Sequence, residues 1–197
     1  INGFKYKKNL TIDAKNSGTL SRLILGLLIK CPKKIKIIGD KSLSKRDFSR
    51  VTIPLEKFGV KFSYKIKDKL PLTILGAQSI EGIEYLENKG SAQCKSSVML
   101  AALNASGTTS IKAKKSRNHT ELLFKYLKIP IKVRKTKKFD FIDIKKPKKI
   151  NAFNYQIPGD ISSSAFFIVL TTLANDSKLL IKNVNINPSR VGVITIL

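Results

Sequence analysis

One loop occurs three times in this chain of 197 residues and constrains its fold more than any other feature. Ser44, Ser116 and Ser189 mark the three copies, so the spacings are 72 (116 minus 44) and 73 (189 minus 116) residues. In each copy the serine has Arg or Lys beside it and precedes a helical pattern. A repeat of roughly 72 residues is too long for a small solenoid and fits a supersecondary unit. The chain is therefore expected to repeat one α/β unit.

The order of elements also repeats. The first copy predicts a helix that opens at Asn16 and Ser17, a strand over 33–38, a second helix ending near Phe58 at Gly59, and strands over 60–66 and 70–75. The second copy predicts helices over 91–103 and around 122–127, with strands over 108–112, 131–134 and 139–144. The third predicts a helix over 162–173 and a strand over 178–184. The apolar faces of the first two copies' amphipathic helices are assigned to Leu20, Leu23, Ile24, Leu27, Leu28, and to Leu122, Leu123, Tyr126, Leu127.

Composition places the chain among globular proteins. Apolar residues make up 42% of it, enough to bury a substantial core. The longest apolar runs, 23–29 and 165–170, fall short of the roughly 18 residues that a membrane helix requires, and no signal pattern is present. We therefore expect a cytoplasmic protein without membrane association. Its two cysteines, Cys31 and Cys94, have no zinc-type or disulfide-type spacing.

The formal net charge of +25 requires an explanation. A Lys-rich protein that binds polyanions is one hypothesis, because such a charge attracts nucleic acid. The cations, however, are mostly Lys, are spread over the whole chain and are not interleaved with aromatic residues as a stacking platform requires. We favour a solvated Lys-rich surface with no specific nucleic-acid partner.

The repeated helix starts carry the chemistry. Each copy presents a helix opened by small hydroxyl or amide residues and a loop with Ser beside a cation. Such starts suit phosphate or carboxylate groups, because free backbone N–H groups and the positive end of the helix dipole face the ligand. One such start is ordinary helix capping, whereas repetition at matching places favours a binding surface.

Other kinds of site have little support. The single histidine, His119, and the absence of Gly-x-Ser-x-Gly argue against a Ser/His/Asp hydrolase. Neither glycine-rich nucleotide motif occurs. The acidic residues are too few and too scattered for a metal cluster. Recognition by Ser, Gln, Arg and backbone amides remains, with neither metal nor cofactor.

Six motifs resemble the enolpyruvyl transferases, and within them the EPSP synthase family. They occur in the family's order and span nearly the whole chain. They are Asn16-Ser17-Gly18-Thr19 with Arg22, Gly39-Asp40 through Ser42-Leu43-Ser44-Lys45-Arg46, Gly90-Ser91-Ala92-Gln93 with Lys95-Ser96, Ser116-Arg117-Asn118-His119-Thr120-Glu121, Pro158-Gly159-Asp160 with Ser162-Ser163-Ser164-Ala165-Phe166, and Asn187-Pro188-Ser189-Arg190-Val191-Gly192.

The resemblance implies an α/β fold of two domains, each an inside-out barrel of three βαβαββ units, with the substrates between them. Residues 1–157 would belong to one domain, and residues 158–197 would form the hinge and the beginning of the other. The chain begins at Ile1, without Met, and stops in an apolar run at Leu197. We therefore expect it to lack parts of both domains and to be inactive alone, as a fragment of a protein that is monomeric at full length.

The resemblance also implies a reaction. The family transfers the enolpyruvyl group of phosphoenolpyruvate to the 5-hydroxyl of shikimate 3-phosphate and releases phosphate, in the shikimate pathway and without a cofactor. By position, phosphoenolpyruvate would contact Gly18, Arg46 and Gln93. Shikimate 3-phosphate would contact Ser91, Ala92, Gln93, Ser116 and Arg117. Asn16 and His119 are further candidates, and the proton-transferring residues are expected outside this chain.

Three residues depart from the family pattern. Lys15 replaces a common Gly, Asp47 a Pro, and Asn118 an Asp. The nearest alternative within the superfamily is UDP-N-acetylglucosamine 1-carboxyvinyltransferase, which usually carries a reactive Cys in the loop matching 39–46. No Cys occurs in that loop of this chain.

Overall fold

A computed structural model describes residues 10–197. The chain forms two compact units, one up to Ile150 and one from Asn151 to Leu197. The break comes a little before the predicted domain boundary after residue 157. That the second unit begins another domain of a longer protein stays a prediction.

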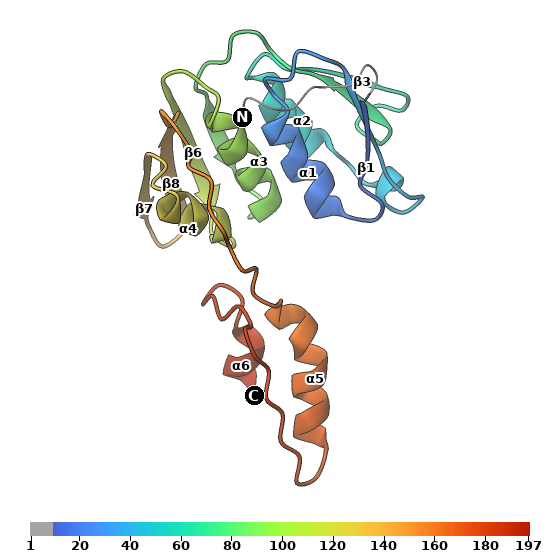
Figure 1. The fold of residues 1–197 in the computed structure, drawn as a ribbon, viewed down its shortest axis with the longest axis vertical. Helices are drawn as coiled ribbons and strands as arrows, with labels where there is room; N and C mark the ends of the chain where they lie inside the picture. The colour runs from blue at the N-terminus through green and yellow to red at the C-terminus, as the bar shows by residue number, and fades with distance from the viewer. Residues whose placement is uncertain (1–9) are drawn as a thin grey trace. The chain divides into compact units, whose positions relative to one another are not determined.

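The first unit contains the same series of elements twice (Figure 1). The order in each half is βαβαββ, so the predicted α/β repeat is confirmed for its first two copies. The first half consists of β1 (Leu10–Asp13), α1 (Gly18–Leu27), β2 (Ile35–Ile38), the short 3-10 helix η1 (Leu43–Lys45), α2 (Ser49–Glu56), β3 (Lys61–Tyr64) and β4 (Leu72–Leu75). The second consists of β5 (Glu84–Glu87), α3 (Ala92–Ala102), β6 (Thr108–Lys114), α4 (His119–Tyr126), β7 (Ile131–Lys135) and β8 (Phe139–Lys145).

Each half forms one four-stranded sheet with the same topology. The strand orders are β1-β2-β4-β3 and β5-β6-β8-β7. In each sheet the first pair of strands is parallel and the other two pairs are antiparallel. Because α1 and α3 connect the parallel strands, their N-termini follow the carboxyl ends of β1 and β5, where ligands of α/β folds commonly bind.

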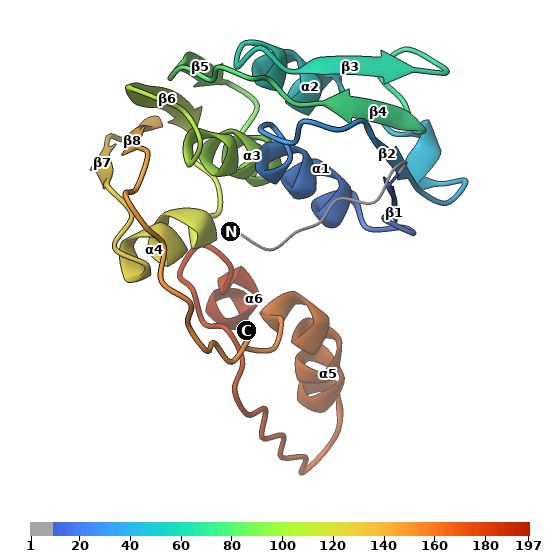
Figure 2. The same ribbon diagram turned by 45° about the horizontal axis from the view of Figure 1, so that its top comes forward.

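In the first unit, α1 and α3 lie side by side between the two sheets (Figures 1 and 2). Helix α1 lies beside α3, and its buried residues are Gly18, Ser21, Leu25 and Gly26. A Cβ at Gly26 would lie 2.1 Å from the backbone oxygen of Ser97 in α3. The Ser97 hydroxyl donates to the Arg22 carbonyl at 2.9 Å. Small residues therefore let the two helix backbones approach closely.

The predicted apolar faces of two helices are wrong in part: Ile24, Leu28 and Leu127 pack against the core, but other members of each face are exposed. In α1 the side chains of Leu20 and Leu27 are exposed, because the contact with α3 requires the small residues on the opposite face. In α4 the buried residues are Glu121 and Phe124, whereas Leu122 and Tyr126 are exposed.

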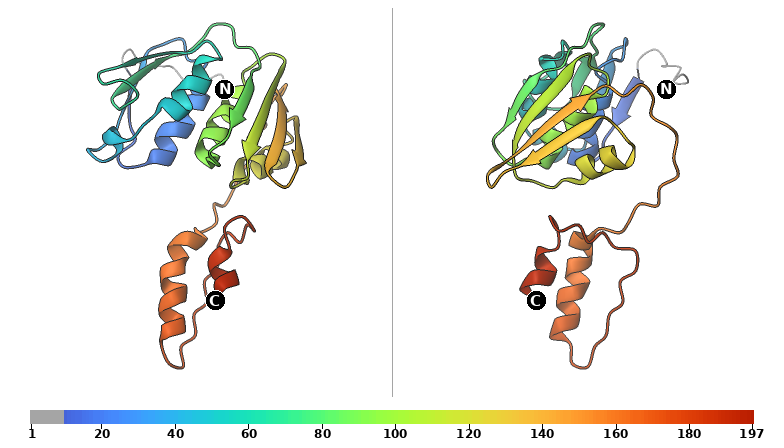
Figure 3. Two further views of the ribbon diagram at one scale, coloured as in Figure 1. Left: turned by 180° about the vertical axis from the view of Figure 1, so that it is seen from behind. Right: turned by 90° about the vertical axis from the view of Figure 1, so that its left-hand side faces the viewer.

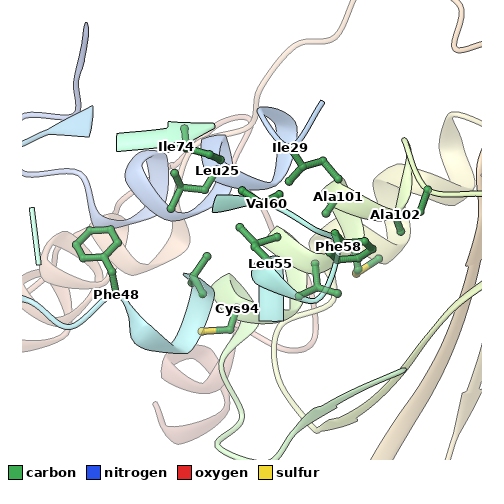
Figure 4. Packing of buried hydrophobic residues seen from close by; sticks show 14 of the residues in the cluster. Leu25, Ile29, Phe48, Leu55, Phe58, Val60, Ile74, Cys94, Ala101 and Ala102 are labelled. Atoms are coloured by element: carbon green, nitrogen blue, oxygen red, sulfur yellow. The ribbon is translucent and has the colours of Figure 1, made fainter. Parts of the chain in front are cut away.

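The core lies among the inner helices and the inward faces of the sheets. Figure 4 shows Leu55 and Phe58, from α2 and the turn after it, packed near Cys94 of α3. Leu25 and Ile74 come from α1 and β4. Both cysteines are buried as free thiols. The sheet β5-β6-β8-β7 faces the viewer in the right-hand view of Figure 3, with α3 behind it.

The second unit has two helices, α5 (Ile161–Leu173) and α6 (Gly192–Ile196). The predicted strand over 178–184 is wrong: the segment makes one isolated bridge, from Val184 to Gly159. A strand requires continuous hydrogen bonding to a neighbour, which this unit does not supply. In the second unit the side chain of Ile161 is buried, whereas Phe166 is 80% exposed and Leu173 is 79% exposed.

Among residues 10–197, none of the helices has the length and apolar character needed to cross a membrane.

Candidate anion-binding site

The N-termini of α1 and α3 are built alike. Ser17 is the N-cap of α1, and its hydroxyl accepts from the Leu20 amide at 3.1 Å. Ser91 is the N-cap of α3, and its hydroxyl accepts from the Cys94 amide at 3.3 Å. Gly90, with φ of +70°, turns the chain into α3 in a conformation that glycine adopts without strain. Both helices therefore direct first-turn amides and a positive dipole end outward.

Gln93 joins these two helix starts. Its amide nitrogen donates to the Thr19 hydroxyl at 2.8 Å, and its amide oxygen accepts from Arg22 Nη1 at 3.1 Å. Gln93 and Thr19 lie in the first turns of α3 and α1, and Arg22 lies one turn further along α1. The predicted convergence of Gln93 with the Gly18 segment is thus present in the structure.

Two guanidinium groups converge on Gly18. A Cβ added there would lie 2.7 Å from Arg22 Nη1 and 2.9 Å from Arg46 Nη1. Arg22 Nη1 also donates to the Gly18 carbonyl at 3.2 Å, and Arg46 Nη2 donates to Asn16 Oδ1 at 3.4 Å. The predicted residues Asn16, Gly18 and Arg46 therefore lie together. We call Asn16, Gly18, Arg22, Arg46 and Gln93 the arginine cluster.

The arginine cluster is positive. Arg22 lies over the ring of Phe48, 5.1 Å from its centroid, and this burial, more than the nearby charges, lowers the pKa of its guanidinium. Arg46 and Arg50 act in the same direction on that pKa. Within the described part of the chain, neither Arg22 nor Arg46 forms a salt bridge with a carboxylate. An anion that accepts from both would compensate the charge.

The other predicted segment, Ser116 to His119, contacts α3 through Lys95, a residue outside the arginine cluster. Lys95 Nζ donates to the Arg117 carbonyl at 3.0 Å and pairs with Glu121 Oε1 at 2.6 Å. The Ser116 hydroxyl is buried and has no hydrogen-bond partner among the described residues. The Arg117 side chain is exposed. His119 is the first residue of α4.

The departures at 15 and 47 fit their surroundings. Lys15 has φ of +48°, the left-handed conformation that a Gly would adopt more easily, and its ammonium pairs with Asp13 at 2.7 Å. Asp47 accepts from the Ser49 hydroxyl at 2.8 Å and from its amide at 2.7 Å, and these bonds lower the pKa of the carboxyl group. Asp47 thus forms a local turn with Ser49 just before α2, whose N-cap is Phe48, and both loops keep a defined form.

Sequence reasoning did not assign a role to Arg22, Thr19, Lys95 or Glu121. Arg22 could have been found, because it lies one helical turn after Gly18 and therefore on the same face. The role of Lys95 could not have been found from the sequence, because one more Lys in a chain with 38 Lys and Arg residues is expected to face solvent.

Two surface grooves lie elsewhere. The larger, of about 820 Å³, lies over the sheet β5-β6-β8-β7 and is lined by Tyr85, Lys112, Arg134 and Phe141 among others. The second, of about 780 Å³, includes Gly59 and Gly76. Neither groove contains a predicted substrate-binding residue. We therefore place the candidate site at the arginine cluster, although both grooves are large.

Comparison with known proteins identifies the family. The family model described as EPSP synthase (3-phosphoshikimate 1-carboxyvinyltransferase) matches residues 1–197. A protein of that name from Enterococcus faecalis is 38% identical over 197 residues, and one from Ruthia magnifica is 44% identical over 199. The solved EPSP synthase from Acinetobacter baumannii has a TM-score of 0.80 at 35% identity and covers 96% of this chain.

The chain spans less than half of these relatives. It covers 45% of the Enterococcus protein and 42% of the solved Acinetobacter chain, in agreement with the expectation of a fragment. The match nevertheless extends along all of the present sequence, including the arginine cluster and the second unit. This chain belongs to the EPSP synthase (3-phosphoshikimate 1-carboxyvinyltransferase) family.

Proposed function

We propose that the full-length protein containing this chain is a 3-phosphoshikimate 1-carboxyvinyltransferase. It would transfer the enolpyruvyl group of phosphoenolpyruvate to the 5-hydroxyl of shikimate 3-phosphate, with release of phosphate. The observation that carries the proposal is the arginine cluster. Two guanidinium groups, which have no carboxylate partner among residues 10–197, meet a buried glycine at two helix N-termini. The family to which the chain belongs supports the choice of substrates.

The arginine cluster would bind phosphoenolpyruvate. Arg46 offers two parallel N–H groups to a phosphate or carboxylate, a geometry that a Lys does not provide. Gly18 lets both guanidinium groups approach the backbone closely, and a side chain there would displace them. Arg22 fixes the amide of Gln93 and thereby the direction in which Gln93 presents its nitrogen.

The start of α3 and the following loop would bind shikimate 3-phosphate. Ser91, Ala92 and Gln93 supply the helix start, and Ser116 and Arg117 supply a hydroxyl and a second cation. Because Gln93 belongs to both sets, it would hold the attacking hydroxyl close to the enolpyruvyl carbon, which is how orientation lowers a reaction barrier. Binding and orientation are the roles of this chain, and proton transfer is assigned to residues outside it.

The test is turnover by the full-length protein. Phosphate release should require both substrates together and should cease when either is omitted. Release from phosphoenolpyruvate with UDP-N-acetylglucosamine, and not with shikimate 3-phosphate, would replace this function by that of the related transferase. The cytoplasmic location and the monomeric state remain predictions, and gel filtration of the full-length protein tests the second.

A further inference from the structure

Lys95 is an unusual residue for the interior of this protein. It lies in the first turn of α3, two residues after Gln93, and its side chain is 0% exposed. Burial of an ammonium group is unfavourable unless its charge is compensated and its N–H groups have acceptors. A chain with so many exposed lysines gains nothing in solubility from burying this one.

The partners of Lys95 come from α4 and from the loop that precedes it. Glu121 in α4 supplies the counter-charge, and its side chain is 5% exposed. The second acceptor is the backbone carbonyl of Arg117, at 3.0 Å. A third link runs beside these, since the hydroxyls of Ser96 and Thr120 are 2.6 Å apart. The buried ammonium thus fixes the peptide that precedes α4 against the first turn of α3.

We propose that Lys95 is a positioning residue that sets the Ser116–Arg117 loop against the α3 start for binding of the phosphorylated cyclic substrate. The inference rests on the proposed function for the identity of that substrate. A buried ion pair contributes little net stability compared with apolar residues of similar size, so its presence calls for another explanation. Alignment of two substrate-contacting segments provides one, because the contact made by Lys95 is to the backbone of Arg117 itself.

The experiment separates positioning from stability. In the full-length protein, the ion pair is replaced by apolar residues of similar length in the double variant Lys95→Met with Glu121→Leu. The single variant Lys95→Met is made for comparison, and it leaves Glu121 buried without its counter-charge. Thermal unfolding, dissociation constants for shikimate 3-phosphate, and KM for each substrate are measured.

We expect the double variant to unfold close to the wild-type temperature. Its dissociation constant for shikimate 3-phosphate should rise about tenfold, as for one misaligned charge-assisted hydrogen bond, while KM for phosphoenolpyruvate changes less than about twofold. The Ser96→Ala variant, which removes the neutral link, should change both constants less.

Normal binding of shikimate 3-phosphate by a stable double variant would overturn the inference, because the ion pair would then be structural only. Failure of the double variant to fold would overturn it as well, since Lys95 would be required for folding itself. Failure of the proposed function would look different, because the wild-type protein would then neither bind shikimate 3-phosphate nor turn it over.

Discussion

Gly18 lets two guanidinium groups approach the start of α1. A Cβ added at this position would lie 2.7 Å from Arg22 Nη1 and 2.9 Å from Arg46 Nη1. Both are ends of flexible side chains, so a methyl group can be accommodated, but only by moving the guanidinium groups. The cost should therefore appear in ligand binding and not in folding.

For Gly18→Ala in the full-length protein, we expect KM for phosphoenolpyruvate to rise about tenfold, the effect of misplacing one charged hydrogen bond, with the unfolding temperature nearly unchanged. Steady-state kinetics with each substrate varied in turn measures this. A variant that loses affinity for shikimate 3-phosphate alone would contradict the placement of Gly18.

Asp47 permits a prediction of pH dependence. Hydrogen bonds from Ser49 lower the pKa of its carboxyl group in the folded state. A lowered pKa means stabilisation that is complete above the unfolded pKa of about 3.9 and is lost as the pH falls through the folded pKa.

Asp47→Ala should lower the unfolding free energy by at most about 1 kcal/mol at neutral pH, as for loss of solvent-exposed hydrogen bonds to Ser49. The difference from wild type should shrink as the pH falls below about 4. Urea denaturation at several pH values measures it. A difference that stays constant down to pH 2 would show that the carboxylate charge is not involved.

Helix packing depends on close approach between α1 and α3. In an unhindered helix, Gly→Ala stabilises by roughly 0.5–1 kcal/mol. At Gly26 the new methyl group would lie 2.1 Å from the Ser97 backbone oxygen, so the helices must separate. We expect Gly26→Ala to destabilise by about 1–3 kcal/mol, as overpacked cores do. Chemical denaturation measures the change in unfolding free energy. An increase in that free energy for Gly26→Ala would contradict the close approach of α1 and α3.

Local chemistry explains what the sequence could predict about these elements. Ser17 and Ser91 mark helix starts through their caps, and both starts are present as predicted. The buried face of α1 could not be predicted from hydrophobicity, because Gly18, Ser21 and Gly26 are buried for their small size. The prediction of a strand over 178–184 was wrong, because the pairing of strands depends on residues far away in the sequence.

The candidate site was partly predictable for the same reasons. Asn16, Gly18, Arg46 and Gln93 were assigned by resemblance, and the structure brings them together. Lys95 and Glu121 were not assigned, because a buried ion pair arises only when α3 and α4 are packed. Substrate contacts for Ser91, Ala92, Ser116 and Arg117 remain proposals.

The molecule as a whole consists of two units that differ in how many of their apolar side chains they bury. The first has a continuous apolar core. The second exposes large apolar side chains on α5, including Phe166, Phe167 and Leu170. A helix with such exposed surface is stable only when something covers it.

A peptide of residues 151–197 should therefore show no cooperative unfolding transition. Circular dichroism during heating measures this, with a fragment of residues 1–150 as the comparison. A sigmoidal transition of the peptide at low concentration would show that the second unit folds without further chain.

The arginine cluster is the centre of the proposed site, and a comparison of two variants tests its role. Arg46→Ala and Arg134→Ala remove the same group from the full-length protein, but Arg134 lies in β7, with its Cζ atom 4.1 Å from the centroid of the Phe141 ring. We expect kcat/KM for phosphoenolpyruvate to fall by about 100-fold or more for Arg46→Ala, and to stay within about twofold of wild type for Arg134→Ala. Equal rates for Arg46→Ala and wild type would contradict the assignment of the arginine cluster as the phosphoenolpyruvate site.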